Sequence, residues 1–234
     1  MKQKFLEKLD KILMSNNAVS DFHSAYNGDI DFKNWLDETI PYIQMCKNQQ
    51  QNNPWHKYNV LDHILHSVEE INKQTRFLPE RDRRMLAYCM LFHDIGKPEK
   101  HITRQKNGQT IDSFFDHNIR SAEICQEILP NLGFDKDETT IMTKLVFKHD
   151  IFMFIKEEKT NNPYWKVLSP TLAKEEIEDL NSVGDGKKLL QYLIMIGRAD
   201  NLAQNEKMTA SSLKMLDKFD SILDKIISDT SREL

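Results

Sequence analysis

The stretch LFHDIGKP, from Leu91 to Pro98, places a His-Asp pair at the end of an apolar helical run, just before Gly96, which is expected to stop the helix. The imidazole of His93 and the carboxylate of Asp94 are both ligands that proteins use for divalent metal ions. Taken alone, the pair is better explained by a core histidine beside a capping aspartate. It gains weight only if other histidines and aspartates stand in similar apolar contexts.

Four further residues of these two types do so: His63, His117, His149 and Asp200. Each has a simpler interpretation. His66 lies on the same helix face as His63 and competes with it for an inward role, while Asp116 is a natural N-cap that would leave His117 exposed. A charged His149 suits a helix C-terminus, and Arg198 is a possible ion-pair partner for Asp200. Together, four histidines and two aspartates in apolar helical contexts favour a metal site.

The composition allows a sizeable core but identifies no partner. With 234 residues, 39% of them hydrophobic, the chain is long enough for one domain, with or without an appended helical piece. The formal net charge of -4 provides no global basic field for nucleic acid. The three cysteines form no Cys-x-x-Cys pair, which argues against a disulfide framework or a thiolate zinc site. We find neither a signal peptide nor a long apolar span, so we expect a cytoplasmic protein without a membrane segment.

Helical periodicity dominates the sequence, which contains only seven Gly and seven Pro. Helices are expected over about 2–15, 31–47, 60–71, 85–92, 116–129, 136–149, 171–182, 186–203 and 209–230. The Gln- and Asn-rich run Lys47 to Asn53 is interpreted as a linker or loop. Between Ile102 and Phe115 the helical period is lost, and Asn107-Gly108 predicts a small β-hairpin there. The expected fold class is all-α, with this hairpin inserted near 102–115.

The order of these motifs resembles the HD superfamily of metal-dependent phosphohydrolases. The resemblance runs from about Asn59 to Ala203 and rests on YNVLDHIL, LFHDIGKP, the Asn-Gly hairpin, FFDHNIRSAE, the His149-Asp150 pair and GRADNLA. It is most similar in pattern to the HD domain of bacterial CCA-adding tRNA nucleotidyltransferases, although the first 50 residues lack the nucleotidyltransferase head. The resemblance implies an N-terminal helical extension over 1–50, an HD metal-binding helical bundle over 51–206 and a packed C-terminal helix over 207–234.

The resemblance also implies a set of ligands and one or two divalent ions. By motif, the first ion is held by His63, His93, Asp94 and Asp200, and Asp94 bridges to a second ion held by His117 and His149. Imidazole and carboxylate together suit Mn, Fe, Co, Ni or Zn. Two further residues are predicted to contact the phosphate: Lys97 as a catalytic and substrate-binding cation, and Arg120 as a substrate-binding cation. Asp150 is predicted to be a catalytic proton acceptor or an orienting partner for a ligand imidazole.

The predicted activity is hydrolysis of a phosphomonoester or phosphodiester by a metal-activated water. The expected substrate is a small-molecule phosphate ester or nucleotide, with a nucleic-acid end as a further possibility. Two alternatives stay open on sequence alone. The same ligand set occurs in HD-type di-iron oxygenases, and a non-catalytic module that senses nucleotides would share the fold.

Overall fold

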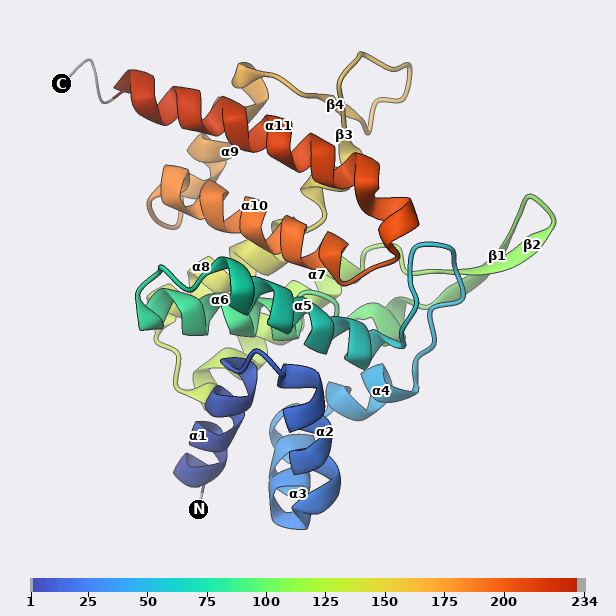
Figure 1. The fold of residues 1–234 in the computed structure, drawn as a ribbon, viewed down its shortest axis with the longest axis vertical. Coiled ribbons are helices and arrows are strands. Elements are labelled where there is room, and N and C mark those ends of the chain that lie inside the picture. Colours follow the sequence, from blue (N-terminus) through green and yellow to red (C-terminus); the bar gives the residue numbers. More distant parts are fainter. Residues whose placement is uncertain (1, 231–234) are drawn as a thin grey trace.

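The computed structural model describes residues 2–230, which form eleven α-helices and a projecting antiparallel β-hairpin (Figure 1). The helices are α1 Lys2–Leu13, α2 Ala18–Gly28, α3 Ile30–Thr39, α4 Tyr42–Asn48, α5 Val60–Gln74, α6 Glu80–Phe92, α7 His117–Ile128, α8 Lys136–Lys148, α9 Pro170–Asn181, α10 Gly186–Leu202 and α11 Glu206–Thr230. The hairpin strands are β1 Ile102–Lys106 and β2 Gln109–Ser113. The expected fold class is therefore confirmed. Met1 and the last four residues of the predicted segment 207–234 lie outside the described residues.

The remaining elements are short. Two-residue strands β3 Ile155–Lys156 and β4 Lys166–Val167 pair in parallel. Three 3-10 helices complete the described chain: η1 Lys97–Lys100, η2 Leu129–Leu132 and η3 Ile151–Phe154. Of these, η1 and η3 matter for the site, because each directly follows a turn that carries a predicted metal ligand.

Two N-terminal elements differ from the expectation. The single helix expected over 31–47 is two helices, α3 and α4, separated at Ile40 and Pro41. Proline has no N–H to continue the hydrogen-bond ladder, and it disfavours helical backbone in the residue before it. Helix α2 was not expected at all, although its buried residues Ala18, Phe22 and Tyr26 recur every four positions. That spacing is a helical signal, diluted by the polar residues between them.

The hairpin forms where the Asn-Gly pair predicted it. Asn107 and Gly108 have φ angles of 51° and 76°, and the paired strands run from Ile102 opposite Ser113 to Lys106 opposite Gln109. Two consecutive positive φ angles are the signature of a type I′ turn, whose twist matches that of the flanking strands. Strand β1 is exposed along its whole length, and the hairpin extends away from the helices (Figure 1).

Helix α6 lies at the centre of the core. All of its residues from Met85 to Phe92 are buried, because α5, α8 and α10 pack around it and α1 packs against it from the N-terminal side. Helix α10 in turn packs against α5, α9 and α11. Most of the buried hydrophobic residues form one continuous cluster, from Phe5 in α1 to Leu223 in α11. The end of α6 is thus fixed deep inside the molecule.

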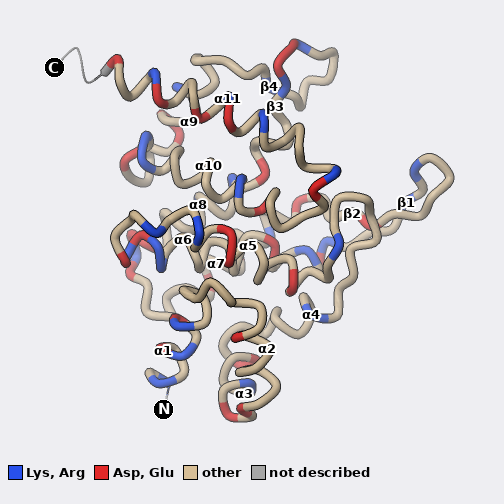
Figure 2. Tube along the Cα trace, in the orientation of Figure 1, with Lys and Arg blue, Asp and Glu red and all other residues tan. Residues whose placement is uncertain are grey.

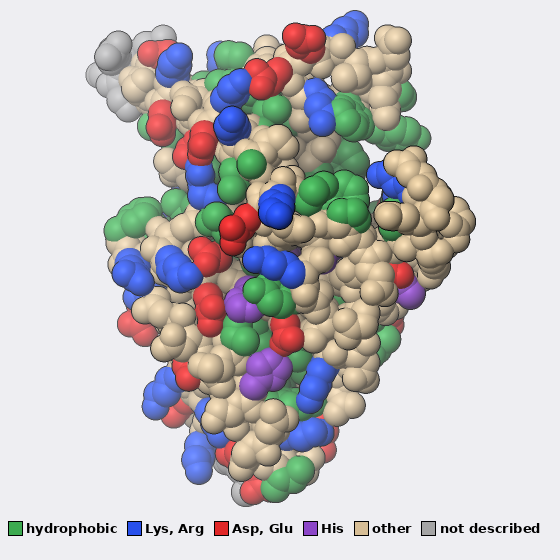
Figure 3. Space-filling model, turned by 45° about the vertical axis from the view of Figure 1, so that its right-hand side comes forward, with side chains coloured by type: hydrophobic (Ala, Val, Ile, Leu, Met, Phe, Trp, Pro, Cys, Tyr) green, Lys and Arg blue, Asp and Glu red, His purple; other side chains and the backbone are tan. Residues whose placement is uncertain are grey.

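The surface has mixed charge. Basic and acidic residues are interspersed along the helices in Figure 2, and on the face in Figure 3 they alternate with hydrophobic side chains. This distribution agrees with the small net charge of -4. Within residues 2–230, no helix has the length and apolar character needed to cross a bilayer.

Gly96 lets α7 approach the turn that follows α6. Helix α6 already ends at Phe92, and Gly96 has an ordinary φ of -81°, so backbone conformation is not the reason for a glycine here. A Cβ atom at this position would lie 2.7 Å from the backbone nitrogen of Ser121 and 2.8 Å from the carbonyl oxygen of His117. The Gly96 N–H also donates to Ser121 Oγ at 2.9 Å. Gly96 therefore sets the distance between the His93–Asp94 turn and α7.

Gly96→Ala is expected to displace the start of α7 and to lower the free energy of unfolding by about 1–3 kcal/mol, as in other overpacked interiors. Urea unfolding followed by circular dichroism measures this loss. Gly28→Ala is the matched control, because a Cβ atom at Gly28 meets nothing within 4 Å. Equal stability of the two variants would contradict the role given to Gly96.

Candidate metal centre

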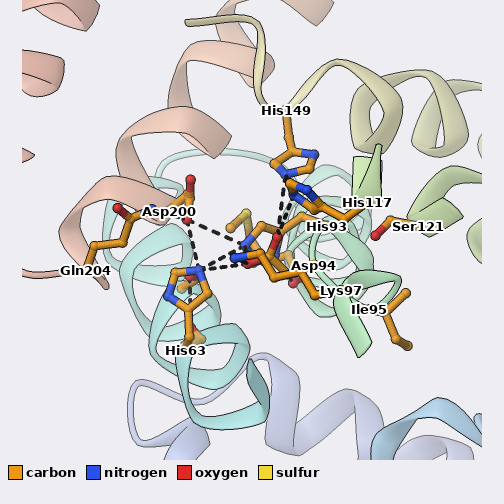
Figure 4. Close-up of polar contacts among 12 residues, drawn as sticks. His63, His93, Asp94, Ile95, Lys97, His117, Ser121, His149, Asp200 and Gln204 are labelled. Atoms are coloured by element: carbon orange, nitrogen blue, oxygen red, sulfur yellow. Dashed lines mark hydrogen bonds and ion pairs between the residues drawn. The ribbon is translucent and has the colours of Figure 1, made fainter. Parts of the chain in front are cut away.

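Six predicted ligands come together inside the helical bundle (Figure 4). They come from elements far apart in the sequence: His63 from α5, His93 and Asp94 from the turn after α6, His117 from the start of α7, His149 from the end of α8, and Asp200 from α10. Five of the six are buried, and the His117 side chain is 13% exposed. These residues, although distant in sequence, meet in space because α5, α7, α8 and α10 pack around the end of α6.

One group consists of His63, His93, Asp94 and Asp200. His63 Nε2 lies 3.0 Å from Asp94 Oδ2, 2.9 Å from Asp200 Oδ1 and 3.3 Å from His93 Nε2. His93 Nε2 lies 3.3 Å from Asp94 Oδ2. Two ligand atoms at about 2.1 Å from one ion lie roughly 3 to 3.4 Å apart. The donor atoms of this group therefore have the spacing of ligands that share one ion.

A second group consists of Asp94, His117 and His149. His117 Nε2 lies 3.0 Å from Asp94 Oδ1 and 3.3 Å from His149 Nε2, and His149 Nε2 lies 3.7 Å from Asp94 Oδ1. The two oxygens of Asp94 thus face different groups. This is the arrangement of a carboxylate that bridges two ions.

Three of the four histidines are oriented by the backbone. The Nδ1 atoms of His93, His117 and His149 each lie 2.7 Å from the carbonyl oxygen three residues earlier. His93 and His149 follow the last residues of α6 and α8, and His117 begins α7. When Nδ1–H donates to a carbonyl, the lone pair of Nε2 is free for a metal, and this second contact is typical of metal-bound histidines.

The contacts of His66, Arg198 and Asp116 decide among the simpler interpretations of the predicted ligands. His66 pairs with Glu69 at 3.5 Å and stacks against Tyr58, outside the cluster, so His63 is the inward histidine of α5. Arg198 contacts Asp217 and Asp220 of α11 and not Asp200. Asp116 stands at the N-cap position of α7 with a φ of 60°, but its side chain makes no capping hydrogen bond. That expected cap is therefore absent.

The charges of the cluster are strongly coupled. Burial opposes a charge on His93, but Asp94 and Asp200 prevail and raise its pKa to about 10. Burial likewise opposes a charge on Asp94, but Lys97 and His93 hold the pKa of this carboxyl well below its usual range. His63 and His93 have the same effect on the pKa of Asp200, against its burial. Both carboxylates are therefore ionised, and His93 holds a proton that a cation at Nε2 would displace.

The donor set fits a divalent transition metal. Asp94 Oδ2 is buried and accepts no well-directed hydrogen bond, although Lys97 Nζ lies 2.6 Å away. A cation would satisfy this oxygen together with the Nε2 atoms that face it. Cys46 is buried nearby, but its thiol donates to the Ile95 carbonyl oxygen, so the ligands are nitrogen and oxygen only. Such a set accepts Mn, Fe, Co, Ni or Zn, and the choice among them stays a prediction.

Lys97 and Asp150 lie beside the cluster. Lys97 is 5% exposed, and its ammonium also donates to Gln51 Oε1 at 2.9 Å. Asp150 Oδ2 lies 3.2 Å from His117 Nε2, and Asp150 Oδ1 lies 3.3 Å from His149 Nε2. Asp150 therefore faces the metal-binding nitrogens, whereas backbone carbonyls occupy the Nδ1 atoms that an orienting carboxylate would contact.

Arg120 contacts other groups. Its guanidinium pairs with Glu99 and Glu123 and donates to the Tyr42 hydroxyl at 2.9 Å. These three partners lie outside the cluster of ligands. The phosphate contact expected of Arg120 stays a prediction.

Two site residues, Gln51 and His56, were not anticipated. Both belong to the segment 49–59, and the sequence predicts only that the first part of this segment is a linker or loop. Gln51 is 5% exposed and holds the Lys97 ammonium. The ring of His56 lies edge-on to that of His63, with centroids 5.1 Å apart. The available signal was the position of His56, seven residues before His63, immediately ahead of the helix that carries the ligand.

Comparison with known proteins gives a distant match, and no family model matches the chain. A bifunctional uridylyltransferase/uridylyl-removing enzyme of Erythrobacter litoralis (strain HTCC2594) is 27% identical over 134 residues, which cover 49% of this chain and 13% of that protein. The enzyme of the same name from Gluconobacter oxydans (strain 621H) is 25% identical over 192 residues, covering 74% of this chain and 17% of that protein. The chain is distantly similar to these bifunctional enzymes. It spans less than a fifth of their length.

His117→Ala is expected to remove one metal ion per chain and to leave the other, because His117 belongs to the second group only. Metal content after gel filtration, measured by mass spectrometry of the dissolved protein, tests this. His101→Ala is the control, since His101 pairs with Asp112 of the hairpin and lies outside both groups. Unchanged stoichiometry in His117→Ala would refute the division into two groups.

Metal affinity is expected to rise with pH. Since the pKa of His93 is raised to about 10, its ring is protonated at neutral pH in the metal-free protein, and a proton competes with the cation at every pH below that value. One displaced proton corresponds to about tenfold in affinity per pH unit. Calorimetric titration with Mn²⁺ between pH 6 and 8, in two buffers of different ionisation enthalpy, measures the proton release. An affinity independent of pH and buffer would contradict the assignment.

Proposed function

We propose that this chain is a metal-dependent phosphohydrolase of the HD type that hydrolyses a phosphate ester of a nucleotide. The observation that carries the proposal is the pair of buried ligand groups that share the Asp94 carboxylate. Two adjacent cations in such a site polarise a phosphoryl oxygen, supply a hydroxide at neutral pH and stabilise the leaving oxygen. In this proposal His63, His93 and Asp200 hold the first ion, and His117 and His149 the second.

The distant relatives favour a nucleotidyl ester as substrate. Their name includes the removal of a uridylyl group. Such a group is attached through its phosphorus, so its removal breaks a P–O bond of a diester. We therefore rank a phosphodiester that bears a nucleotide above a simple phosphomonoester. A nucleic-acid end, suggested by the pattern shared with CCA-adding HD domains, presents the same bond type and belongs to the same proposal.

The chain's own residues divide the remaining work. Asp150 faces the second group, where its carboxylate can accept a proton from the attacking water. Lys97 Nζ lies 2.6 Å from Asp94 Oδ2, which places a positive charge beside the bridging carboxylate and within reach of a phosphoryl oxygen. Arg120 would bind phosphate by exchanging one of its two glutamate partners for it.

Turnover of the p-nitrophenyl ester of uridine 5′-monophosphate is expected to exceed that of p-nitrophenyl phosphate, with Mn²⁺ or Co²⁺ present. Asp94→Ala is expected to abolish turnover and metal retention together, because both groups lose their shared ligand. Lys97→Ala is expected to lower kcat about ten- to a thousandfold with little loss of metal, and Lys97→Arg to retain part of the activity. Full activity of Asp94→Ala would overturn the proposal.

The same preparation separates the two alternative functions. A di-iron oxygenase would consume oxygen and show iron absorption bands when purified without added metal. A sensing module would bind the nucleotide without releasing product. Measuring oxygen uptake, nucleotide binding and p-nitrophenol release on one sample therefore decides among the three.

A further inference from the structure

His63 lacks the contact that orients the other three histidines of the cluster. Its Nδ1 atom is buried and has no hydrogen-bond partner. The reason is its place in the chain. His63 lies within α5, where its own N–H donates to the Asn59 carbonyl oxygen as part of the helix. His93, His117 and His149 stand at helix ends, where the carbonyl oxygen three residues earlier lies within reach of Nδ1. A ligand imidazole without such a contact leaves its tautomer and ring orientation unset.

The neighbouring ring of His56 also has a nitrogen without a hydrogen-bond partner. Its Nδ1 atom is also buried without a hydrogen-bond partner, and the two rings lie at 73° with centroids 5.1 Å apart. Buried polar atoms without a partner are rare in proteins, and each costs free energy. Two such atoms on adjacent rings are complementary if one carries a proton and the other does not.

The segment that carries His56 is fixed on both sides of it. Before His56, Asn205, which directly precedes α11, donates to the carbonyl oxygens of Pro54 and Trp55, at 2.9 Å and 2.8 Å. Gln51 donates to the Tyr58 carbonyl oxygen at 3.3 Å and accepts from Lys97. Since these contacts tie the segment 49–59 to the site and to the connection between α10 and α11, the His56 ring stays against His63.

We propose that His56 is the positioning residue of His63 in the metal centre. The two Nδ1 atoms are not hydrogen-bonded to each other in the structure. When an ion is bound at Nε2 of His63, the rings turn so that the Nδ1–H of His63 donates to the Nδ1 of His56, which is neutral and carries its own proton on Nε2. The contact directs the Nε2 lone pair of His63 toward the ion that it shares with Asp94 and Asp200. The inference rests on the proposed metal centre and concerns its first group alone, because backbone carbonyls orient the histidines of the second group.

Titration with Co²⁺ alone tests the proposal without any turnover. His56→Phe keeps an aromatic ring against His63 but removes the acceptor, whereas His56→Asn restores an acceptor oxygen close to the position of Nδ1. His66→Phe is the matched control, since His66 lies in α5, as His63 does, but outside the cluster. Visible absorption of bound Co²⁺ and competition with a chelator give the affinity of each ion.

His56→Phe is expected to weaken one of two Co²⁺ ions by about 10- to 100-fold, the usual loss when an orienting partner is removed, and to leave the other unchanged. His56→Asn is expected to recover part of that loss, and His66→Phe to match the wild type. Unchanged affinities in His56→Phe, or equal weakening of both ions, would overturn the proposal. A wild-type protein that binds no Co²⁺ would instead overturn the metal centre itself.

Imidazole ¹⁵N resonances of the Zn²⁺-loaded wild type provide a test that needs no variant to fold. A proton on Nδ1 of His63 together with a proton on Nε2 of His56 is the expected pair of tautomers. A proton on Nδ1 of His56 would overturn the proposal, because that atom could then no longer accept.

Discussion

The Asp94 carboxylate is the group on which the site depends. It is buried at the end of the central helix α6, where an unpaired charge would be costly, and four imidazoles and one ammonium surround its two oxygens. Each oxygen faces a different set of histidines, so the carboxylate both divides and joins the two ligand groups. The rest of the fold can be understood as the packing needed to bring α5, α7, α8 and α10 against this one position.

Helix ends do much of the orientation. An α-helix leaves its last carbonyl groups without internal partners, and in α6 and α8 such carbonyls accept from the ring nitrogens of the histidines that follow. The same contact recurs at the start of α7 through the Phe114 carbonyl oxygen. Only His63, which lies inside a helix, has no backbone carbonyl oxygen against its Nδ1 atom. The ring that lies beside it is that of His56, from the segment before α5. Backbone carbonyls thus contact the Nδ1 atoms of three ligands but not that of the fourth.

The sequence predicted those parts of the molecule that local rules determine. Helical periodicity predicted most of the helices, and Asn107-Gly108 predicted the hairpin, because both signals act within a few residues. The six ligands could be proposed because the motif preserves their order along the chain. Gln51 and His56 could not, since a polar residue in a loop acquires a role only through what packs against it in the folded chain. Gly96 was interpreted as a helix stop for a similar reason: its real constraint is the approach of α7, a contact made 25 residues further along.

The two ligand groups differ in how much of the chain they enclose. The second group draws its residues from 94 to 149, whereas the first joins His63 to Asp200, which are 137 residues apart. An ion in the first group would therefore close a long loop of the unfolded chain, as a disulfide does, and loops of this length lose the most conformational entropy on closure. In that sense the first ion would act as a cross-link between α5 and α10, which pack together although they are far apart in the sequence, while the second would join α7 and α8, which are consecutive α-helices of the chain.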